Sequence, residues 1–426
     1  MSNVKIRDIR VIMTQPDRGA RFTVVKVETT EPGLYGLGDA SNRTRPMAVK
    51  SALEDYLRPF LIGKDVANIE DIWQSAYVSS YWRNSPVLNN ALGGVDEALW
   101  DIKGKMAGLA VYDLLGGKAR EAAATYAHAS GRDIQETEDM AHKLIEEGFH
   151  HIRVQTATPG FATYGVSGEG GDRDPQDGPK WITDRAAPAD AKYGWAQTAG
   201  IYEPRPYMRS AIQLLEHMRN KLGWKIELLH DVHERLPGVM GAEFAKEVEE
   251  YKLFFLEDLY SPNDIEWFKL VRQQCATSLA IGEIFHHPHE ILPLLKDRLI
   301  DFLRLRVAHV GGITPARKYA TVAEAFGVKT AWQGPGNISP VGVAAHLHLD
   351  LAVWNFGIQE GPEHGQRTVE MFKGSPVVKD GYMWSNGKPG LGVEIDEAMA
   401  AKFPHQPGPG GVFDNVRRAD GTVVTP

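Results

Sequence analysis

The first 30 residues alternate between apolar and polar positions, as half-buried strands do. Ile6, Ile9 and Val11 lie in one such run, and the segment FTVVKV at 22–27 forms a second. This pattern predicts a pair of antiparallel strands. The glycine-rich stretch that follows, GLYGLGDAS at 33–41, is predicted to be a loop.

Between about residues 47 and 117 the apolar positions recur every three or four residues, which is the helical period. The clearest carriers of this pattern are Val95, Leu99, Ile102, Met106 and Leu109. Gly116 and Gly117 are expected to end the turn that follows. We expect residues 1–122 to form a separate α+β capping domain, which a loop and short helix within about 385–426 complete.

After residue 120, short apolar runs alternate with helical segments. Eight of these runs are candidate strands: 125–128, 151–154, 226–232, 253–259, 278–284, 302–307, 328–332 and 354–359. Strands that alternate with helices form parallel sheets, and eight of them suggest a closed barrel. The predicted fold class is therefore α/β, with a TIM-like (β/α)8 or (β/α)7β barrel over residues 123–384.

One connection in the predicted barrel is unusually long. The segment 157–205 is rich in Gly, Asp and Pro and has no clear helical or strand period. Structureless loops of this length inside a domain are usually functional lids or disordered segments. This segment is therefore either a functional lid or disordered.

Composition excludes several classes of partner. The formal net charge is −8 without a block of like charge, so no electrostatic footprint for nucleic acid is present. The single cysteine, Cys275, excludes an internal disulfide and fits a reducing compartment. The N-terminal segment is typical of a strand rather than a signal peptide, and no apolar run is long enough to cross a bilayer. We expect a soluble cytoplasmic protein that binds neither nucleic acid nor membrane.

Three carboxylates follow successive predicted strands. Asp231 ends the third strand, Glu257 the fourth and Glu283 the fifth, and each follows the previous one by 26 residues. Equivalent positions on neighbouring barrel strands lie side by side at the carboxyl-terminal rim. Taken alone, a carboxylate at a strand end is more often a helix cap or a surface charge, but three in register would repel one another unless a cation neutralised them. Oxygen ligands from three strands suit Mg²⁺.

The neighbours of these carboxylates receive different predictions. Because side chains alternate along a strand, Asp258 and His230 are expected to point away from the metal, in capping and structural roles respectively. His233 shares the parity of Asp231 and lies two residues further out. A histidine there can be structural, but next to a metal we favour a general acid or base.

At this point the chain resembles the enolase superfamily, and within it the mannonate dehydratase family of acid-sugar dehydratases. The superfamily likeness is carried by ALWDIKGKMAGLAVYDLLGG in the first domain, by the three strand-end acids, and by PGLGVEID near the end. The closer likeness, which covers nearly the whole chain, is carried by these segments: YAHASG, HDVH, LEDL, GEIF, VGGIT, GPGNISPVG and NFGIQE.

The resemblance implies a reaction. A six-carbon sugar acid would bind Mg²⁺ through its carboxylate, lose the proton beside that carboxylate, and eliminate its 3-hydroxyl to give a 2-keto-3-deoxy acid. The family's base is an Arg–Tyr pair, which matches Arg153 and Tyr164, and His233 matches the residue that protonates the leaving hydroxyl. An unperturbed tyrosine has a pKa near 10, so a neighbouring guanidinium is needed to favour the phenolate. Without the resemblance, an ordinary loop aromatic stays an alternative interpretation of Tyr164.

The substrate-contacting positions of the family fall on five residues: His128, Arg304, Gln333, Asn337 and Glu360. Arg304 also has a structural interpretation, as a salt bridge inside the barrel. Gln333 stands where the family has histidine, and Asn337 where it has aspartate, so two titratable groups are lost. The family's asparagine in the first domain falls at Arg43 or Asn42. We infer retained enolisation with an altered substrate preference, and Arg43 could face a second acidic group of a diacid.

Three functions stay open from the sequence. The first is an Mg²⁺-dependent dehydratase acting on D-mannonate or a related aldonate. The second is epimerisation or dehydration of another sugar acid, which the absence of lysine at the end of the second strand disfavours. The third is a sugar-acid sensor whose catalysis has decayed through Gln333 and Asn337.

Two further expectations concern metals and assembly. The histidines of FHHPHE, His286, His287 and His289, invite a zinc site, but their irregular spacing disfavours it. His309 is similarly ambiguous. Because members of the family tend to be oligomeric, a homo-oligomer is expected.

Overall fold

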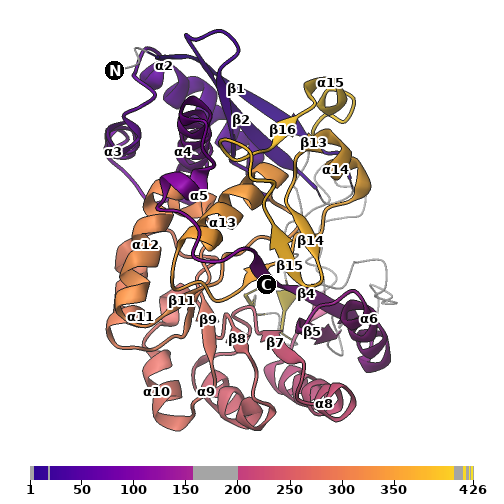
Figure 1. Ribbon diagram of the computed structural model, residues 1–426. Coiled ribbons are helices and arrows are strands. Elements are labelled where there is room, and N and C mark those ends of the chain that lie inside the picture. The colour runs from indigo at the N-terminus through magenta and orange to yellow at the C-terminus, as the bar shows by residue number, and fades with distance from the viewer. Residues whose placement is uncertain are drawn as a thin grey trace, which may run out of the picture. The chain divides into compact units, whose positions relative to one another are not determined.

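The computed structural model describes residues 4–17, 20–156, 200–406, 416–418, 422 and 424–425. The chain forms two compact units, drawn in Figure 1. The first consists of Met1–Thr125, Gly282–Lys296 and Leu303–Gly411, and the second of Tyr126–Ile281, Asp297–Phe302 and Val412–Pro426. Within the described ranges, no helix combines the length and apolarity needed to span a membrane.

The first unit begins with a three-stranded antiparallel sheet in the order β1-β2-β3. Its strands are β1 (Ile6–Thr14), β2 (Phe22–Thr29) and β3 (Tyr35–Asp39). Strands β1 and β2 confirm the predicted antiparallel pair. The prediction of a loop at 33–41 is wrong, because this segment contains β3. Gly36 and Gly38 explain this, since a Cβ atom at either would collide with the main-chain carbonyl of Ala98 or Gly94. Glycine lets the strand pack directly on a helix.

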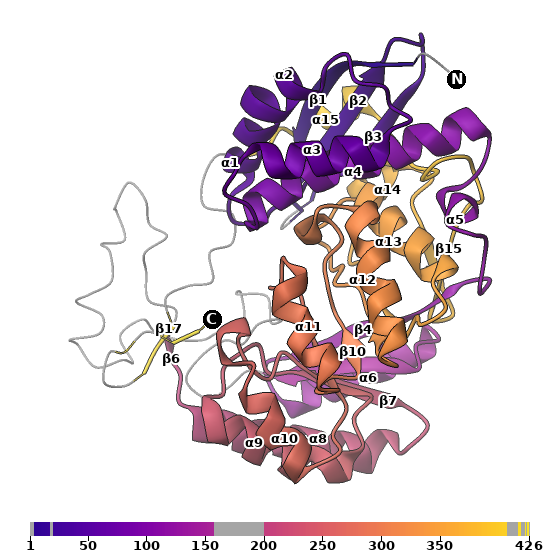
Figure 2. The same cartoon turned by 90° about the vertical axis from the view of Figure 1, so that its left-hand side faces the viewer.

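That helix, α4, lies against the sheet, as Figure 2 shows. It is the longest of a helical region that confirms the predicted pattern between 47 and 117. The helices are α1 (Pro46–Ser51), η1 (Ala52–Leu57), α2 (Arg58–Leu61), α3 (Ile69–Ser79), α4 (Pro86–Ala107) and α5 (Val111–Leu114). Ser85 caps α4 by accepting a hydrogen bond from the Leu88 N–H, and Gly108 ends it in the left-handed conformation.

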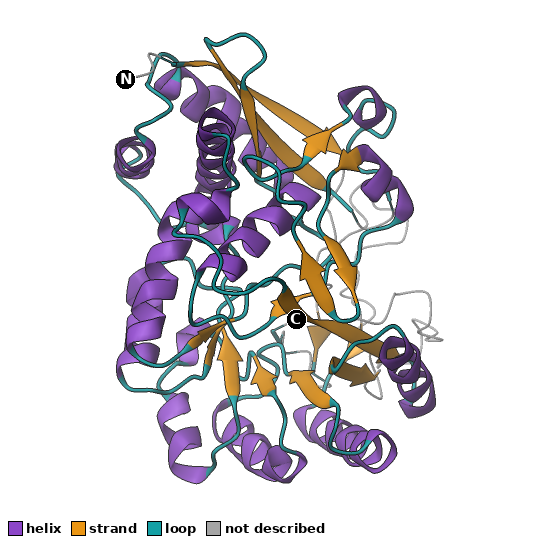
Figure 3. Ribbon diagram, in the orientation of Figure 1, coloured by secondary structure: helices purple, strands orange, loops and turns teal. Residues whose placement is uncertain are grey.

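The second unit contains a parallel sheet whose strands follow one another in chain order. They are β4 (Ala123–Gly131, which starts in the first unit), β5 (His151–Thr156), β7 (Glu227–Asp231), β8 (Phe255–Glu257) and β9 (Leu279–Ile281). These confirm the first five predicted barrel strands. The helices between them are α6 (Ile134–Glu146), α8 (Pro204–Leu222), α9 (Gly238–Glu247) and α10 (Trp267–Gln274). Helices α8, α9 and α10 pack beside one another along the sheet (Figure 3).

The other three predicted strands are also present: β10 (Phe302–Leu303), β11 (Lys329–Thr330) and β12 (Gln359–Glu360). The chains of the sixth and seventh are neighbours, because the Ala331 N–H donates to the Leu303 carbonyl and the Gln333 N–H to the Leu305 carbonyl. The associated helices are α11 (Pro288–Lys296), α12 (Ile313–Ala325) and α13 (Pro340–Ala352). Short turns complete both units: η3 (Val248–Tyr251), η4 (Pro262–Asp264) and η5 (Ala308–Val310).

The C-terminal part of the first unit contacts its N-terminal sheet. Glu397 forms ion pairs with Arg10 and Lys26, and the Thr14 hydroxyl donates to the Phe403 carbonyl. The elements of this segment are α14 (Gln366–Met371), β13 (Phe372–Lys373), β14 (Val377–Lys379), β15 (Tyr382–Trp384), β16 (Glu394–Ile395) and α15 (Glu397–Ala400). Two further short strands, β6 (Gly200–Ile201) and β17 (Val416–Arg417), pair with each other in parallel.

Helix α4 buries an aspartic acid that links it to α12. One carboxylate oxygen of Asp96 accepts a hydrogen bond from the Thr314 N–H at 2.9 Å, and the Thr314 hydroxyl accepts from the Trp100 indole at 2.8 Å. Burial raises the pKa of Asp96 to about 7, against the smaller opposing effect of the Thr314 hydrogen bonds. The folded protein therefore holds this proton at a pH where the unfolded chain has lost it.

We expect the free energy of unfolding to fall as pH rises from about 4 to about 7. An acid with a raised folded-state pKa stabilises the fold below its unfolded pKa, and each unit of pKa difference is worth about 1.4 kcal/mol. Asp96→Asn keeps an oxygen for the Thr314 N–H but removes the titration. Urea unfolding at pH 5 and pH 7.5 should show a flatter pH dependence for this variant. An unchanged slope would show that Asp96 is ionised in the folded protein.

Candidate active site

The second unit brings together carboxylates at the ends of two adjacent strands. Asp231 and Glu257 are register partners at the ends of β7 and β8. Asp231, Glu257 and Asp258 are all buried, and each offers a carboxylate oxygen within 4.8 Å of the other two. The Arg153 guanidinium lies beside them, with Nη1 3.3 Å from Glu257 Oε2 and 3.6 Å from Asp231 Oδ2. Such a set of oxygen donors is suited to a hard divalent cation.

The prediction that Asp258 points away from this cluster is wrong. Asp258 has φ +41°, in the left-handed region, and β8 ends one residue earlier at Glu257. The alternation of side chains applies only while the backbone remains extended. The turn at Asp258 therefore brings its carboxylate to the same side as that of Glu257.

Neighbouring side chains fix the end of β7. His230 is buried, with Nδ1 2.9 Å from the Val154 carbonyl and Nε2 2.9 Å from the Tyr207 hydroxyl. Burial lowers the pKa of His230 to about 4, so the ring is neutral, donating from Nδ1 and accepting at Nε2. The Gln155 amide donates to the Asp231 carbonyl at 3.1 Å. These contacts confirm the structural role predicted for His230.

His233 lies where the chain leaves β7. Its main-chain N–H donates to Asp231 Oδ1 at 2.8 Å, and His233 and Glu234 have φ +53° and +58°. Because the backbone is not extended here, the alternation of side chains along a strand does not apply to His233. Its main-chain hydrogen bond nevertheless keeps it close to Asp231. His128 lies on β4 directly opposite Arg153 on β5 in the parallel register. Both histidines thus flank groups of the acidic cluster.

In the first unit, Arg304 joins the buried Glu360 to the half-buried Glu283. Its Nη2 lies 3.3 Å from Glu283 Oε2 and 3.1 Å from Glu360 Oε2. The same Glu360 oxygen accepts a hydrogen bond from the Gly334 N–H at 2.8 Å. The structure therefore brings together Arg304 and Glu360, both predicted to contact substrate, with Glu283, predicted to bind metal. These contacts also form the salt bridge that was the alternative, structural interpretation of Arg304.

Three other predicted residues have different placements. Gln333 is buried, and its Oε1 has no hydrogen-bond partner among the described residues. Asn337 Oδ1 accepts from Arg306 Nη1 at 3.3 Å. Tyr164 lies outside the described residues, so its role stays a prediction. Arg306 was missed by the sequence reasoning, although its position two residues after Arg304 places both arginines at the same parity.

The histidine-rich loop is held by contacts to Glu290. The main-chain N–H groups of His286 and His287 both donate to Glu290 Oε2, and His309 Nδ1 lies 3.1 Å from the Glu283 carbonyl. Among the residues whose positions are described, the metal-ligand grouping is that of Asp231, Glu257 and Asp258.

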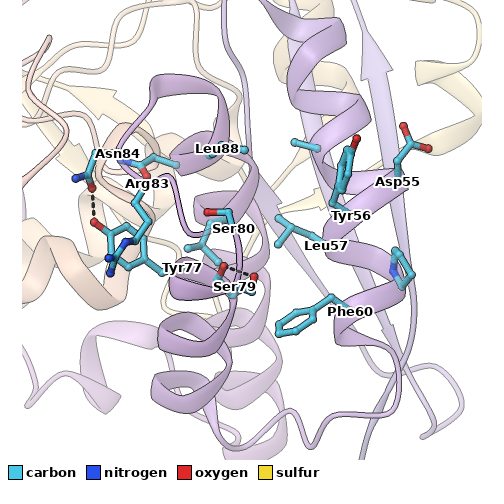
Figure 4. A pocket seen from close by; sticks show the side chains of 15 residues that line it. Asp55, Tyr56, Leu57, Phe60, Tyr77, Ser79, Ser80, Arg83, Asn84 and Leu88 are labelled. Carbon is cyan, nitrogen blue, oxygen red and sulfur yellow. Dashed lines mark hydrogen bonds between the residues drawn. The ribbon is translucent and has the colours of Figure 1, made fainter.

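The first unit also contains a cavity of about 700 Å³ between η1, α3 and the start of α4 (Figure 4). Its walls are largely apolar, with Leu57, Phe60 and Leu88 among them. The Tyr77 hydroxyl hydrogen-bonds to Asn84 Oδ1 at one side. None of the predicted site residues lines this cavity, so it is separate from the candidate active site.

Comparisons with known proteins decide the family. Residues 3–116 match the mandelate racemase / muconate lactonizing enzyme N-terminal domain, and residues 136–399 match the enolase C-terminal domain-like family. The D-galactonate dehydratase family member RspA of Pantoea ananatis is 49% identical, and a member from Salmonella virchow is 48% identical, each over 100% of both chains. The chain belongs to the D-galactonate dehydratase family of the enolase superfamily.

This membership also settles the fold class. The crystal structure of an enolase from Pantoea ananatis with bound D-gluconate and Mg has a TM-score of 0.90 and is 47% identical, with 100% of both chains covered. The fold is the enolase fold, an N-terminal α+β capping domain followed by an α/β barrel-like domain, as predicted. The superfamily and the dehydratase class are confirmed, whereas the relatives carry the D-galactonate dehydratase family name in place of the mannonate dehydratase family predicted from the sequence.

Proposed function

We propose that this member of the D-galactonate dehydratase family is an Mg²⁺-dependent dehydratase of a six-carbon aldonic acid, D-mannonate or a close stereoisomer. The observation that most strongly supports this proposal is the buried cluster of Asp231 and Glu257 beside Arg153. The D-gluconate and Mg bound by the relative from Pantoea ananatis support both the substrate class and the cation.

The acidic cluster fits a magnesium ion by its chemistry. Its ligand atoms are carboxylate oxygens, which Mg²⁺ prefers, and carboxylates this close repel one another unless a cation is present. We assign metal binding to Asp231 and Glu257, with Glu283 as the third ligand that the strand spacing predicts. Asp258 competes for that third place because its carboxylate lies beside the first two. Bound Mg²⁺ would neutralise charge that develops on the substrate carboxylate as the neighbouring proton leaves.

The proton transfers are assigned to side chains near this cluster. Tyr164, as phenolate, would accept the proton from C2, and the positive charge of Arg153 would favour that phenolate. His233, in its protonated form, would donate to the leaving 3-hydroxyl, which departs as water. The enol product then tautomerises to the 2-keto-3-deoxy acid. The placement of His233 two residues after Asp231, with its main-chain N–H donating to Asp231 Oδ1, supports its part in this scheme.

The remaining predicted residues are assigned to substrate binding: His128, Arg304, Gln333, Asn337 and Glu360. Gln333 supports this through its buried Oε1, an acceptor that has no partner among the described residues. A substrate hydroxyl can donate to it, whereas glutamine cannot transfer a proton as histidine would. The substitution therefore changes hydroxyl recognition and leaves the proton-transfer pair in place.

A stereochemically complete set of aldonic acids, screened with Mg²⁺ for 2-keto-3-deoxy products, tests the proposal. We expect turnover of at least one C6 aldonate, and none after treatment with a chelator. Restoring Mg²⁺ should restore the rate. A fully metal-loaded protein that converts no member of the set would contradict the proposed activity.

One observation favours a second function, that of a sugar-acid sensor without catalytic activity. Gln333 and Asn337 both lack the titratable groups that the mannonate dehydratase family has at these positions. A sugar-acid sensor that has lost catalysis would bind D-gluconate or D-mannonate in calorimetry. It would also show no exchange of the C2 proton with deuterated solvent. Exchange without loss of water would instead indicate epimerisation.

A further inference from the structure

Arg306 is a buried cation that the proposed chemistry does not use. The residue is only 3% exposed, and the carboxylates of Asp39, Glu97, Glu283 and Glu360 attract its charge without any described one lying within ion-pair distance. Its Nη2 donates to the Ser41 carbonyl at 2.7 Å, and its Nη1 donates to Asn337 Oδ1 at 3.3 Å. A buried charge without an ion-pair partner is costly, so its hydrogen bonds have to be favourable and well oriented.

The two partners of Arg306 belong to segments far apart in the sequence. Ser41 directly precedes Asn42 and Arg43, the two positions at which the family's asparagine in the first domain falls, and Arg43 is the residue that could face an acidic group of the substrate. Asn337 lies in the loop after β11, which also carries Gln333. All of these residues belong to the first unit. Arg306 therefore links the segment that carries Arg43 to the loop of Gln333 and Asn337, which the proposed function assigns to substrate binding.

The hydrogen bonds of the local turn indicate which of Asn42 and Arg43 is the better candidate to contact substrate. Asn42 Oδ1 accepts hydrogen bonds from the Thr44 and Arg45 N–H groups at 3.2 and 2.9 Å, so this side chain holds its own loop. Arg43 is only half-buried. Arg43 is accordingly the better candidate to contact substrate, and its position depends on where the turn is held.

A second link joins the same two segments without Arg306. Asp39 Oδ1 accepts from the Ser41 hydroxyl at 2.6 Å and from the Ser339 N–H at 3.0 Å. This contact holds the Ser41 hydroxyl and the Ser339 N–H, whereas Arg306 holds the Ser41 carbonyl and the Asn337 side chain. Loss of Arg306 should therefore loosen the Ser41 carbonyl and the Asn337 side chain, while the Asp39 contact keeps the two segments together.

We propose that Arg306 is a positioning residue for substrate recognition: it holds the 41–45 turn and Asn337 in fixed relation and so sets where Arg43 and Asn337 meet the sugar acid. The inference rests on the proposed function for its substrate, but its structural part is independent of turnover. It also accounts for asparagine at 337, because Asn337 offers Arg306 an oxygen while keeping an N–H₂ group for a ligand.

The test compares Arg306→Gln and Arg306→Lys with a buried arginine that has only a structural role. Arg219 is the matched control, since it is buried and donates to the main-chain carbonyls of Tyr251, Gly223, Ile226 and Lys252. For Arg306→Gln we expect KM for the aldonate to rise about ten- to a hundredfold, as for loss of a charge-assisted hydrogen bond, with kcat changed far less. Arg306→Lys should recover part of the loss. Arg219→Gln should lower the unfolding temperature with KM unchanged.

Hydrogen exchange separates this proposal from the proposed function. In Arg306→Gln the amides of Thr44 and Arg45 should exchange faster than in the wild-type protein, whether or not a substrate is found, while those of α4 stay protected. If KM and exchange at 42–45 both match the wild-type values and only thermal stability falls, as in Arg219→Gln, Arg306 is merely structural and the proposal fails. If no aldonate is converted but exchange accelerates as expected, the proposed function falls and the positioning role stands.

Discussion

Asp231→Asn is expected to abolish Mg²⁺-dependent turnover, with a fall of about three orders of magnitude or more, because a catalytic cation contributes several kcal/mol to the transition state. The variant should fold normally. Asparagine keeps an oxygen to accept from the His233 N–H, and the hydrogen bond from Gln155 goes to the main-chain carbonyl of residue 231. The measurements are steady-state kinetics and the rise in unfolding temperature that Mg²⁺ produces, which the variant should lose. Full activity in Asp231→Asn would remove the metal assignment and the enolisation with it.

Two matched variants identify the third ligand. Asp258→Asn and Glu283→Gln each remove one negative charge with little change of shape. If Glu283 ligates the ion, Glu283→Gln should weaken Mg²⁺ binding far more than Asp258→Asn does. The opposite order would show that Asp258, whose carboxylate lies beside those of Asp231 and Glu257, is the third ligand. Magnesium titration followed by calorimetry distinguishes the two cases without requiring a substrate.

The sequence predicted the elements and the pairing of two of the carboxylates proposed to bind metal, because both follow from regular patterns. Apolar runs that alternate with helical segments predicted all eight barrel strands. The spacing of 26 residues from Asp231 to Glu257, one βα unit, predicted that these two residues pair at the ends of β7 and β8. Spacing of this kind is visible in a sequence because each βα unit has a similar length. It requires no knowledge of the contacts between distant segments.

Features that depend on backbone turns or on distant contacts were not predictable in this way. Asp258 joins the acidic cluster because its φ is positive, and the strand period says nothing about the residue after the strand ends. The strand β3 was predicted as a loop because its glycines suggest flexibility, whereas here they allow close packing on α4. The contact of Arg306 with the Ser41 carbonyl could not be predicted either, because Ser41 is 265 positions away along the chain.

Arg304→Met is expected to destabilise the protein by about 3–5 kcal/mol, which is the usual effect of removing one partner of a buried ion pair. The substitution leaves Glu360 and Glu283 without the guanidinium that lies 3.1 and 3.3 Å from them. Glu360 is completely shielded from water, so solvent offers it little compensation, whereas the side chain of Glu283 is 17% exposed and is partly compensated. Urea unfolding should show the loss as a lower midpoint with an unchanged slope. An unchanged midpoint would mean that the two carboxylates are neutral or are held by other groups.

The double variant Arg304→Met/Glu360→Gln shows how much of this loss comes from the unpaired carboxylate. Glutamine at 360 keeps an oxygen for the Gly334 N–H, so the turn after β11 retains its hydrogen bond. If the stranded negative charge of Glu360 causes most of the destabilisation, the double variant should be more stable than Arg304→Met alone, because neutral groups cost less to bury than an unpaired ion. Equal stability of the two would assign the loss to Glu283 or to packing. A recovery without return of activity would show that Arg304 and Glu360 stabilise the fold and also serve the substrate, since stability alone would then not suffice for turnover.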